Sequence, residues 1–234
     1  MKLLSVNLSE PKAVEYLGKT VTTGIFKRSV EGRVALHGQN LEGDGQADRK
    51  NHGGACKAVY AYPFEHYADW ARELGREDFV FGQFGENFTV EGMPEDAIHI
   101  GDQFRIGSAV IEVTQPRVPC FKLAMKMGLE AFPKRFLASG RTGFYARVLE
   151  TGEVEAQDPI LCIEAGLPRV SVRAIARLMF QEKADLEGAM LALQLPALSP
   201  GWRMVFEKRL VDAGVPAADL PKASGKGEGC GEGL

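Results

Sequence analysis

Short apolar runs separated by glycine fill the first two thirds of the chain, and this pattern limits the possible folds more than any other feature. The strand-length runs are KLLSVNLS, TGIFKRSV, GRVALHG, ENFTVEG, FRIGSAVIEVTQP, GFYARVLE and DPILCIEAG. Runs of this length between turn residues are typical of strands. Within one run, Gly107 and Ser108 lie between β-branched residues, which predicts a hairpin with a two-residue turn. We therefore expect a mainly β domain over residues 1–166.

Two helical inserts interrupt the predicted strands. The first begins near Pro63, has Tyr67 and Trp70 on one face, and meets a plausible stop at Gly75. The second begins just after Pro119. Both inserts are expected to pack beside the strands.

The pattern changes to amphipathic helices after residue 166. Ser171 precedes the first helical segment as a predicted N-cap, and two more segments follow, DLEGAMLALQ and SPGWRMVFEKRLVDAG. Residues 167–221 are therefore predicted to form a small three-helix domain, whose apolar surface is either core or the contact of a homodimer. Residues 222–234 are rich in Gly, Lys and Glu and are expected to be a disordered tail.

Composition excludes several classes of protein. The 234 residues carry a formal net charge of −3, so no overall positive field points to nucleic acid. No apolar stretch approaches the roughly 20 residues that span a bilayer, and the N-terminus lacks a signal-peptide core; we expect a cytoplasmic protein without membrane contact. The four cysteines form no C-x-x-C pair, which argues against a disulfide framework or a zinc signature.

A glycine-rich basic loop, GDGQADRKNHGGACK, is the first candidate site. It combines flexible backbone, exposed N–H groups and positive charge, so it is suited to hold an anion. It lacks the spacing of a phosphate-binding P-loop. His52 and Cys56 have the spacing of a helical metal pair, but no second ligand pair completes a site. The alternative is a solvated turn.

The second candidate is FGQFGENFTVEG, in which Glu86 and Asn87 stand at the head of a strand. Glycines before them let a ligand approach the backbone closely. The alternative is that Asn87 caps a turn.

The third candidate is Cys120 in TQPRVPCFKLAMKMG. Pro116 and Pro119 restrict the preceding backbone, so the cysteine is held at the start of a predicted helix. The helix N-terminus, with Arg117 and Lys122 nearby, favours a thiolate that attacks electrophiles or binds soft metals. The alternative is a small buried apolar side chain.

Taken together, these stretches resemble the MOSC domain, named for the C-terminal domain of molybdenum cofactor sulfurases, and specifically its YiiM-like members. The motifs DRKNHGG, GENFT and QPRVPCFK carry the resemblance in this order, and SVRAIARLMF with LSPGWRMVFEKRL resembles the three-helix domain of those proteins. One departure is Cys56, where the family usually has an acidic residue.

The resemblance implies a β-barrel that binds a molybdopterin-type molybdenum cofactor, with Cys120 as catalytic residue and metal ligand. It implies that the remaining site residues contact the cofactor: Arg49, Lys50, His52, Gly53, Gly54, Glu86, Asn87, Arg117 and Lys122.

The implied activity is reduction of N-hydroxylated compounds, such as hydroxylaminopurines or amidoximes, to the amine or amidine. Electrons would come from a separate reductase, most simply a flavoprotein. One alternative is a carrier that passes the cofactor or a sulfane sulfur from Cys120 to another protein. The other is a cysteine-dependent enzyme without metal.

Overall fold

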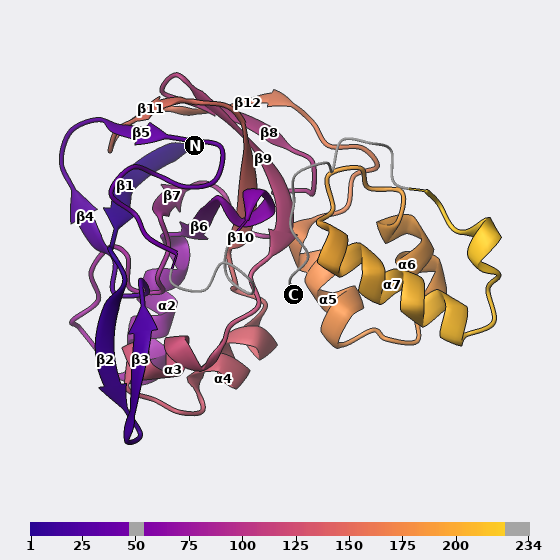
Figure 1. Ribbon diagram of the computed structural model, residues 1–234, viewed down its shortest axis with the longest axis horizontal. Coiled ribbons are helices and arrows are strands. Elements are labelled where there is room, and N and C mark those ends of the chain that lie inside the picture. Colours follow the sequence, from indigo (N-terminus) through magenta and orange to yellow (C-terminus); the bar gives the residue numbers. More distant parts are fainter. Residues whose placement is uncertain (47–53, 223–234) are drawn as a thin grey trace.

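The computed structural model describes residues 1–46 and 54–222, and its centre is an eight-stranded sheet (Figure 1). All neighbouring strands are antiparallel except β6 and β7. In sheet order the strands are β12 (Ile160–Glu164), β8 (Gln103–Ile106), β9 (Ala109–Pro116), β10 (Phe144–Glu150), β6 (Val59–Pro63), β7 (Phe88–Glu91), β1 (Lys2–Leu8) and β4 (Arg28–Val30). The mainly β fold and the hairpin at Gly107 are confirmed.

The expected closed barrel is not found among the described residues, because the sheet ends at β12 and β4. Its two halves nevertheless approach each other where β1 begins. The amide of Leu3 donates to the carbonyl of Asp158 at 3.0 Å, and the amide of Ile160 donates to that of Met1 at 3.1 Å. Pro159 lies between them opposite Lys2. The contact is an isolated bridge and does not extend into a strand pair.

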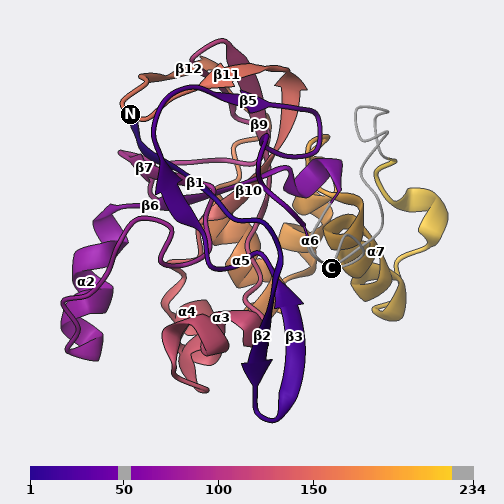
Figure 2. The ribbon, with the colours of Figure 1, turned by 60° about the vertical axis from the view of Figure 1, so that its left-hand side comes forward.

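Two small sheets flank the main one. β11 (Gly152–Val154) pairs with β5 (Val34–Leu36), and β2 (Lys12–Tyr16) pairs with β3 (Lys19–Thr23). The β2–β3 hairpin turns at Leu17 and Gly18, both at positive φ, and projects beside α3 (Figure 2). Strands β2 and β3 were not predicted, because most of their side chains are exposed and the apolar alternation that marks a strand is missing.

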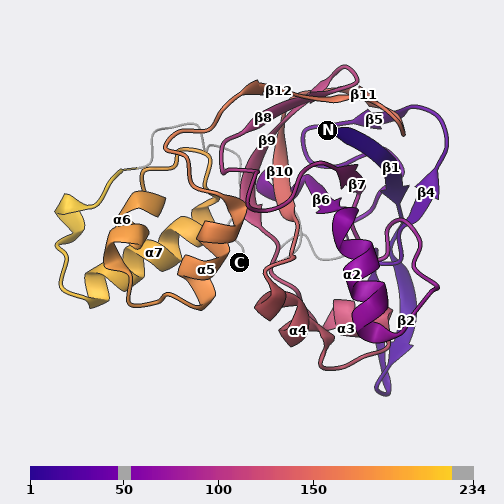
Figure 3. The same ribbon diagram turned by 180° about the vertical axis from the view of Figure 1, so that it is seen from behind.

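Helices α2 (Glu65–Leu74), α3 (Phe121–Met127) and α4 (Phe132–Ser139) lie at one end of the sheet (Figure 3). The two predicted inserts correspond to α2, which ends at left-handed Gly75, and to α3; α4 was not predicted. Together with β6 they enclose an aromatic core that includes Tyr62, Trp70, Phe84 and Phe136, each at most 1% exposed. This core supports the loops that precede α3.

The C-terminal helices are α5 (Val172–Phe180), α6 (Leu186–Ala192) and α7 (Pro200–Asp212), followed by the 3₁₀ turn η2 (Ala217–Asp219). Ser171 caps α5 as predicted, since its side chain accepts a hydrogen bond from the amide of Ala174. The helices pack on β9: Trp202 is fully buried, and the amide of Ser199 donates to the carbonyl of Thr114. The expected tail at 222–234 lies outside the described residues apart from Lys222.

Within the described residues, no helix is long and apolar enough to cross a membrane.

Candidate functional site

Cys120 stands where β9 gives way to α3. It is the N-cap residue of α3, with extended backbone (φ −125°, ψ 178°), and its side chain makes no capping hydrogen bond. Pro119 precedes it, and the amide of Arg117 is bonded to the carbonyl of Gly143 at 3.2 Å, so both ends of the turn are held. Cys120 is half-buried and, with Cys162, is one of two free cysteines in the described part of the chain.

Cys120 borders a cavity that is open to solvent. Segments from six separate parts of the chain form its wall. The lining residues are Thr23, Gly24, Ile25, Lys27, Asp44, Gly45, Gln46, Lys57, Tyr60, Gly85, Asn87, Arg117, Cys120, Lys122 and Tyr145. The structure therefore brings together four predicted site residues: Asn87, Arg117, Cys120 and Lys122.

Positive charge predominates in the wall of this cavity. Its charged residues are Lys27, Lys57, Arg117 and Lys122, opposed by Asp44. Arg117 is 6% exposed, and one of its guanidinium nitrogens donates to the carbonyl of Phe84. Cationic side chains of this kind attract anionic groups, so the cavity is suited to an anionic ligand.

Asp44 connects three separate segments at the cavity wall. Its Oδ1 accepts hydrogen bonds from the Nζ of Lys27 and from the amide of Ser9, the latter at 2.9 Å. Its Oδ2 accepts from the side-chain amide of Asn87 at 2.9 Å. The side chains of Lys27 and Asp44 are 8% and 4% exposed.

Asn87 is held on both sides of its side chain. Its Oδ1 accepts from the amide of Tyr60 at 3.2 Å, and its Nδ2 donates to Asp44. These contacts fix the direction of the amide group at the cavity wall. Asn87 therefore does more than cap a turn, because its side chain connects β6 to the loop that carries Asp44.

Glu86 is not a lining residue of the cavity, contrary to the expectation that it shares the wall with Asn87. It is completely buried, and its carboxylate accepts hydrogen bonds from the hydroxyls of Tyr67 and Thr89 and from the amides of Gly82 and Phe84. The loop before β7 folds around this carboxylate. A buried carboxylate has no access to water, so the protein must supply hydrogen-bond donors to its oxygens. Glu86 thus supports the wall from beneath.

The glycine-rich basic loop is only partly within the described residues. Arg49, Lys50, His52 and Gly53 lie outside them, and their predicted contacts with a cofactor stay predictions. Gly54 precedes the 3₁₀ turn η1 (Ala55–Lys57) with φ 92° and is not a lining residue. Cys56, the departure from the family pattern, is buried, and its carbonyl accepts from the hydroxyl of Thr114 at 2.7 Å.

Sequence reasoning missed several residues at the cavity. Lys27 and Asp44 were not singled out, and neither were Tyr60 and Tyr145, which stand on the neighbouring strands β6 and β10. The alternation of Tyr60 with Tyr62 in VYAYP was the one available signal, because it places two polar-tipped aromatic rings on one face of a strand. Nothing in the sequence pairs Lys27 with Asp44.

Lys126 lies on α3 and contacts Ile25, one of the lining residues of the cavity. Its Nζ donates to the carbonyl of Ile25 at 2.9 Å and to that of Gly82. Burial, with further effects from nearby Lys27 and Arg117, lowers the pKa of Lys126 to about 8, although Glu86 opposes the shift. Lys126 therefore interacts electrostatically with Glu86, Lys27 and Arg117, which are buried in or beside the cavity wall.

Two family models match this chain. The model of the MOSC domain matches residues 48–161, and that of the YiiM-like three-helix domain matches residues 170–211. YflK, an uncharacterized protein of Bacillus subtilis, is 43% identical over 88% of this chain and 93% of its own length. The chain belongs to the MOSC-domain family of YiiM-like proteins. The resemblance inferred from the motifs is thereby confirmed.

Solved structures agree with this family. The crystal structure of YiiM from Geobacillus stearothermophilus superposes with a TM-score of 0.77 and 36% identity, covering 89% of this chain and 98% of that one. A Gibberella moniliformis protein named "Reductase" is 34% identical over 77% of this chain, which corresponds to 32% of the fungal protein. The YiiM-like fold therefore accounts for both domains of this chain.

Proposed function

We propose that this YiiM-like chain is a molybdenum-cofactor-dependent reductase of N-hydroxylated compounds such as hydroxylaminopurines and amidoximes. The observation that carries the proposal is the thiol of Cys120 at the wall of a cavity whose charged groups are mostly cations. When bound, the cofactor would supply the two-electron chemistry that removes oxygen and leaves an amine or amidine and water.

The residues of the cavity fit such a cofactor chemically. Among the described residues, no group of three or more His, Cys, Asp or Glu side chains is placed to hold a metal ion. A metal held here by Cys120 would take its other ligands from the cofactor that carries it. A thiolate also favours softer metals over magnesium or calcium.

The phosphate and the acidic pterin of the cofactor require cations and N–H donors. Arg117 and Lys122 flank Cys120 in the sequence and line the same cavity, so they are suited to hold those groups beside the metal. Asn87 presents a fixed amide to the same space. The Tyr60 and Tyr145 rings add aromatic surface to the wall.

The comparisons support an oxidoreductase in general terms. A relative named "Reductase" shares this domain, although the domain makes up only about a third of that protein. We propose that the electrons reach this chain from a separate flavoprotein reductase.

Metal content and turnover of Cys120→Ala test the proposal. Protein from a host that makes the cofactor, grown with abundant molybdate, is analysed by mass spectrometry for molybdenum and assayed for hydroxylaminopurine reduction with a chemical electron donor. Cys162→Ala is the matched control, because Cys162 is an exposed free cysteine on β12. We expect near-stoichiometric molybdenum and turnover in wild type and Cys162→Ala, and loss of both in Cys120→Ala.

Other outcomes identify the alternatives. Molybdenum that depends on Cys120 without turnover of any N-hydroxylated compound would indicate a cofactor carrier. Turnover by metal-free protein that iodoacetamide abolishes would indicate a cysteine enzyme. Retention of both molybdenum and activity by Cys120→Ala would refute the proposal.

A further inference from the structure

A buried ion pair that the proposed function does not yet use faces the same cavity as Cys120. Lys27 and Asp44 both line the cavity, and the Nζ of Lys27 donates to Oδ1 of Asp44. The other bonds of Asp44, to the amide of Ser9 and to Asn87, hold the carboxylate in place. These bonds fix the direction of the Lys27 ammonium group at the wall of the cavity.

The proposed reaction consumes protons. Reduction of an N-hydroxylated compound breaks one N–O bond, takes up two electrons from the reductase and two protons, and releases the amine and one water molecule. At least one of these protons must reach the departing oxygen inside the cavity. A protein group that releases a proton within reach of that oxygen would accelerate the step.

Among the described lining residues, few groups can act as that proton donor. Arg117 stays protonated at all relevant pH values, and Cys120 is assigned to the metal. Burial raises the pKa of Tyr60 and of Tyr145, which makes both phenols poorer acids. The remaining titratable cations of the wall are lysines, and the Lys27 ammonium is oriented by a carboxylate that lines the same cavity.

We propose that Lys27, oriented by Asp44, is the general acid that protonates the departing oxygen of the N-hydroxylated substrate. The Lys27 ammonium loses one proton to that oxygen and is reprotonated from solvent, with Asp44 compensating its positive charge. This inference rests on the proposed function, since it assigns a role in the same reaction.

The electrostatic surroundings of Lys27 are consistent with a proton donor. Burial lowers the pKa of Lys27, while the charge and hydrogen bond of Asp44 and the charge of Glu86 oppose the shift and Arg117 reinforces it. A lysine is a more effective acid when its pKa lies closer to the working pH. Among the described residues, the other charged or titratable groups near it are Lys126 on α3 and, in the cavity wall, Lys57, Tyr60, Cys120, Lys122 and Tyr145.

The first test compares Lys27→Met, Lys27→Arg and Asp44→Asn with wild type, each loaded with cofactor and checked for molybdenum content and melting temperature. Lys27→Met should lower kcat by on the order of 100-fold, the usual contribution of a general acid. Lys27→Arg should be equally slow, because arginine keeps the charge but does not release its proton. Full activity of Lys27→Arg would show that only the charge matters and would overturn the donor role.

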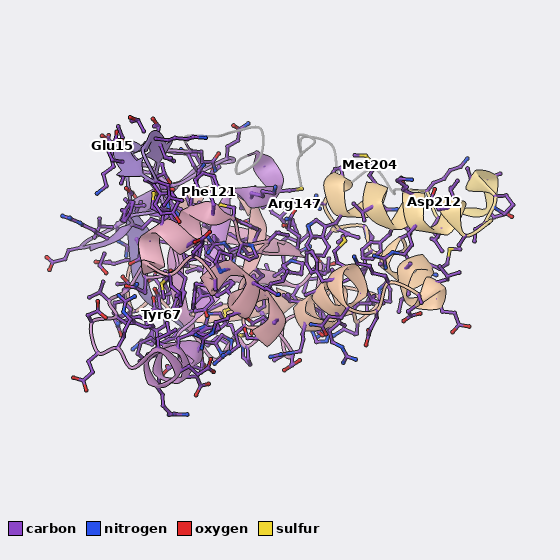
Figure 4. The ribbon with its side chains drawn as sticks, turned by 90° about the horizontal axis from the view of Figure 1, so that it is seen from below. Glu15, Tyr67, Phe121, Arg147, Met204 and Asp212 are labelled. Atoms are coloured by element: carbon purple, nitrogen blue, oxygen red, sulfur yellow. The ribbon has the colours of Figure 1, made fainter. Side chains whose placement is uncertain are left out.

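Asp44→Asn tests the partner. Because the carboxylate favours the protonated lysine, its removal should move the alkaline limit of the kcat profile to lower pH. The matched control is the exposed pair Lys208 and Asp212 on α7, at the opposite end of the molecule from Phe121 of α3 (Figure 4). Lys208→Met and Asp212→Asn should leave the profile unchanged. An unshifted profile in Asp44→Asn would contradict the proposal.

A second readout does not depend on the cofactor. NMR of protein carrying ¹³C-labelled lysine, with the Lys27 signal assigned from its loss in Lys27→Arg, follows each ammonium group through its titration. The pKa of Lys27 should lie below the ordinary value for lysine, and lower still in Asp44→Asn. An ordinary lysine pKa for Lys27 would overturn the donor role.

The two proposals fail in different ways. Wild-type protein that carries molybdenum but reduces no N-hydroxylated compound would overturn the proposed function, and the donor role with it. Active wild-type protein with an equally active Lys27→Arg variant would overturn the donor role alone.

Discussion

The guanidinium carbon of Arg117 lies 4.5 Å from the centre of the Tyr60 ring, so a buried cation is stacked on an aromatic wall of the cavity. The same side chain donates to the carbonyl of Phe84, in the loop that Glu86 holds from within. Arg117 therefore couples β6, the loop before β7 and the turn that carries Cys120. Its position follows from the protein scaffold before any ligand is bound.

Arg117→Lys tests this coupling. Lysine keeps the charge but loses the planar stacking on Tyr60, so we expect the free energy of unfolding to fall by about 1–2 kcal/mol. Urea denaturation measures the loss. The control is Arg105→Lys, in the exposed pair between Arg105 and Glu150, which should change little. Equal stabilities of the two variants would show that the stacking contributes nothing.

Glu86→Gln tests whether Glu86 supports the loop. The carboxylate accepts from four donors, whereas glutamine offers one oxygen and turns an NH₂ group toward the others. We expect a loss of stability on the order of 3 kcal/mol. Glu91→Gln, at an exposed position of β7, is the control for urea denaturation. A loss of cofactor binding at unchanged stability would instead favour direct contact between Glu86 and the cofactor.

Lys126 makes a testable contribution to the pH dependence of stability. Its pKa is about 8 in the folded protein, below the ordinary 10.5. Between these values the unfolded chain binds more protons, so this group makes the free energy of unfolding rise with pH. In urea denaturation at several pH values from about 7.5 to 9.5, Lys126→Met should show a smaller rise than wild type. Lys134→Met, at an exposed position of α4, should retain the wild-type slope; a Lys126→Met slope equal to it would contradict the prediction.

Two glycines with the same φ angle allow the cost of backbone strain to be measured apart from the cost of a steric clash. Gly143 and Gly128 both have φ +66°, but a β-carbon at Gly143 would lie 2.4 Å from the carbonyl oxygen of Ala61 and 2.9 Å from the Tyr60 ring, whereas none lies within 4 Å at Gly128. Gly128→Ala should cost about 1 kcal/mol for its backbone conformation alone. Gly143→Ala should cost several times more or prevent folding, as measured by thermal and urea denaturation. Similar losses for both would show that strand β6 yields easily.

Local signals predicted the elements whose chemistry is local. Ser171 could be assigned as an N-cap, and Gly75 as a helix stop, because each acts on backbone groups within a few residues. The start of α3 at Cys120 followed in the same way from the prolines before it. By contrast, the β2–β3 hairpin has too few buried side chains to show a pattern, and barrel closure depends on contacts between the two ends of the strand domain.

The role of Glu86 shows why a motif alone does not place a side chain. Its neighbour Asn87 faces the cavity while Glu86 points into the protein, because successive residues entering a strand alternate between its two faces. The sequence marked both residues as important but did not distinguish the surface that each serves.

The sequence by itself determined which parts of the chain are mainly strands and which are mainly helices. It also determined the rigid position of Cys120 between a proline and a helix. Only the tertiary structure decided that Lys27, Asp44, Asn87 and Arg117 meet around that cysteine. The physical reason is that turns, caps and periodicity act over a few residues of chain. A cavity is built from long-range packing, which joins Lys27 to Asp44 across 17 positions and Asp44 to Asn87 across 43.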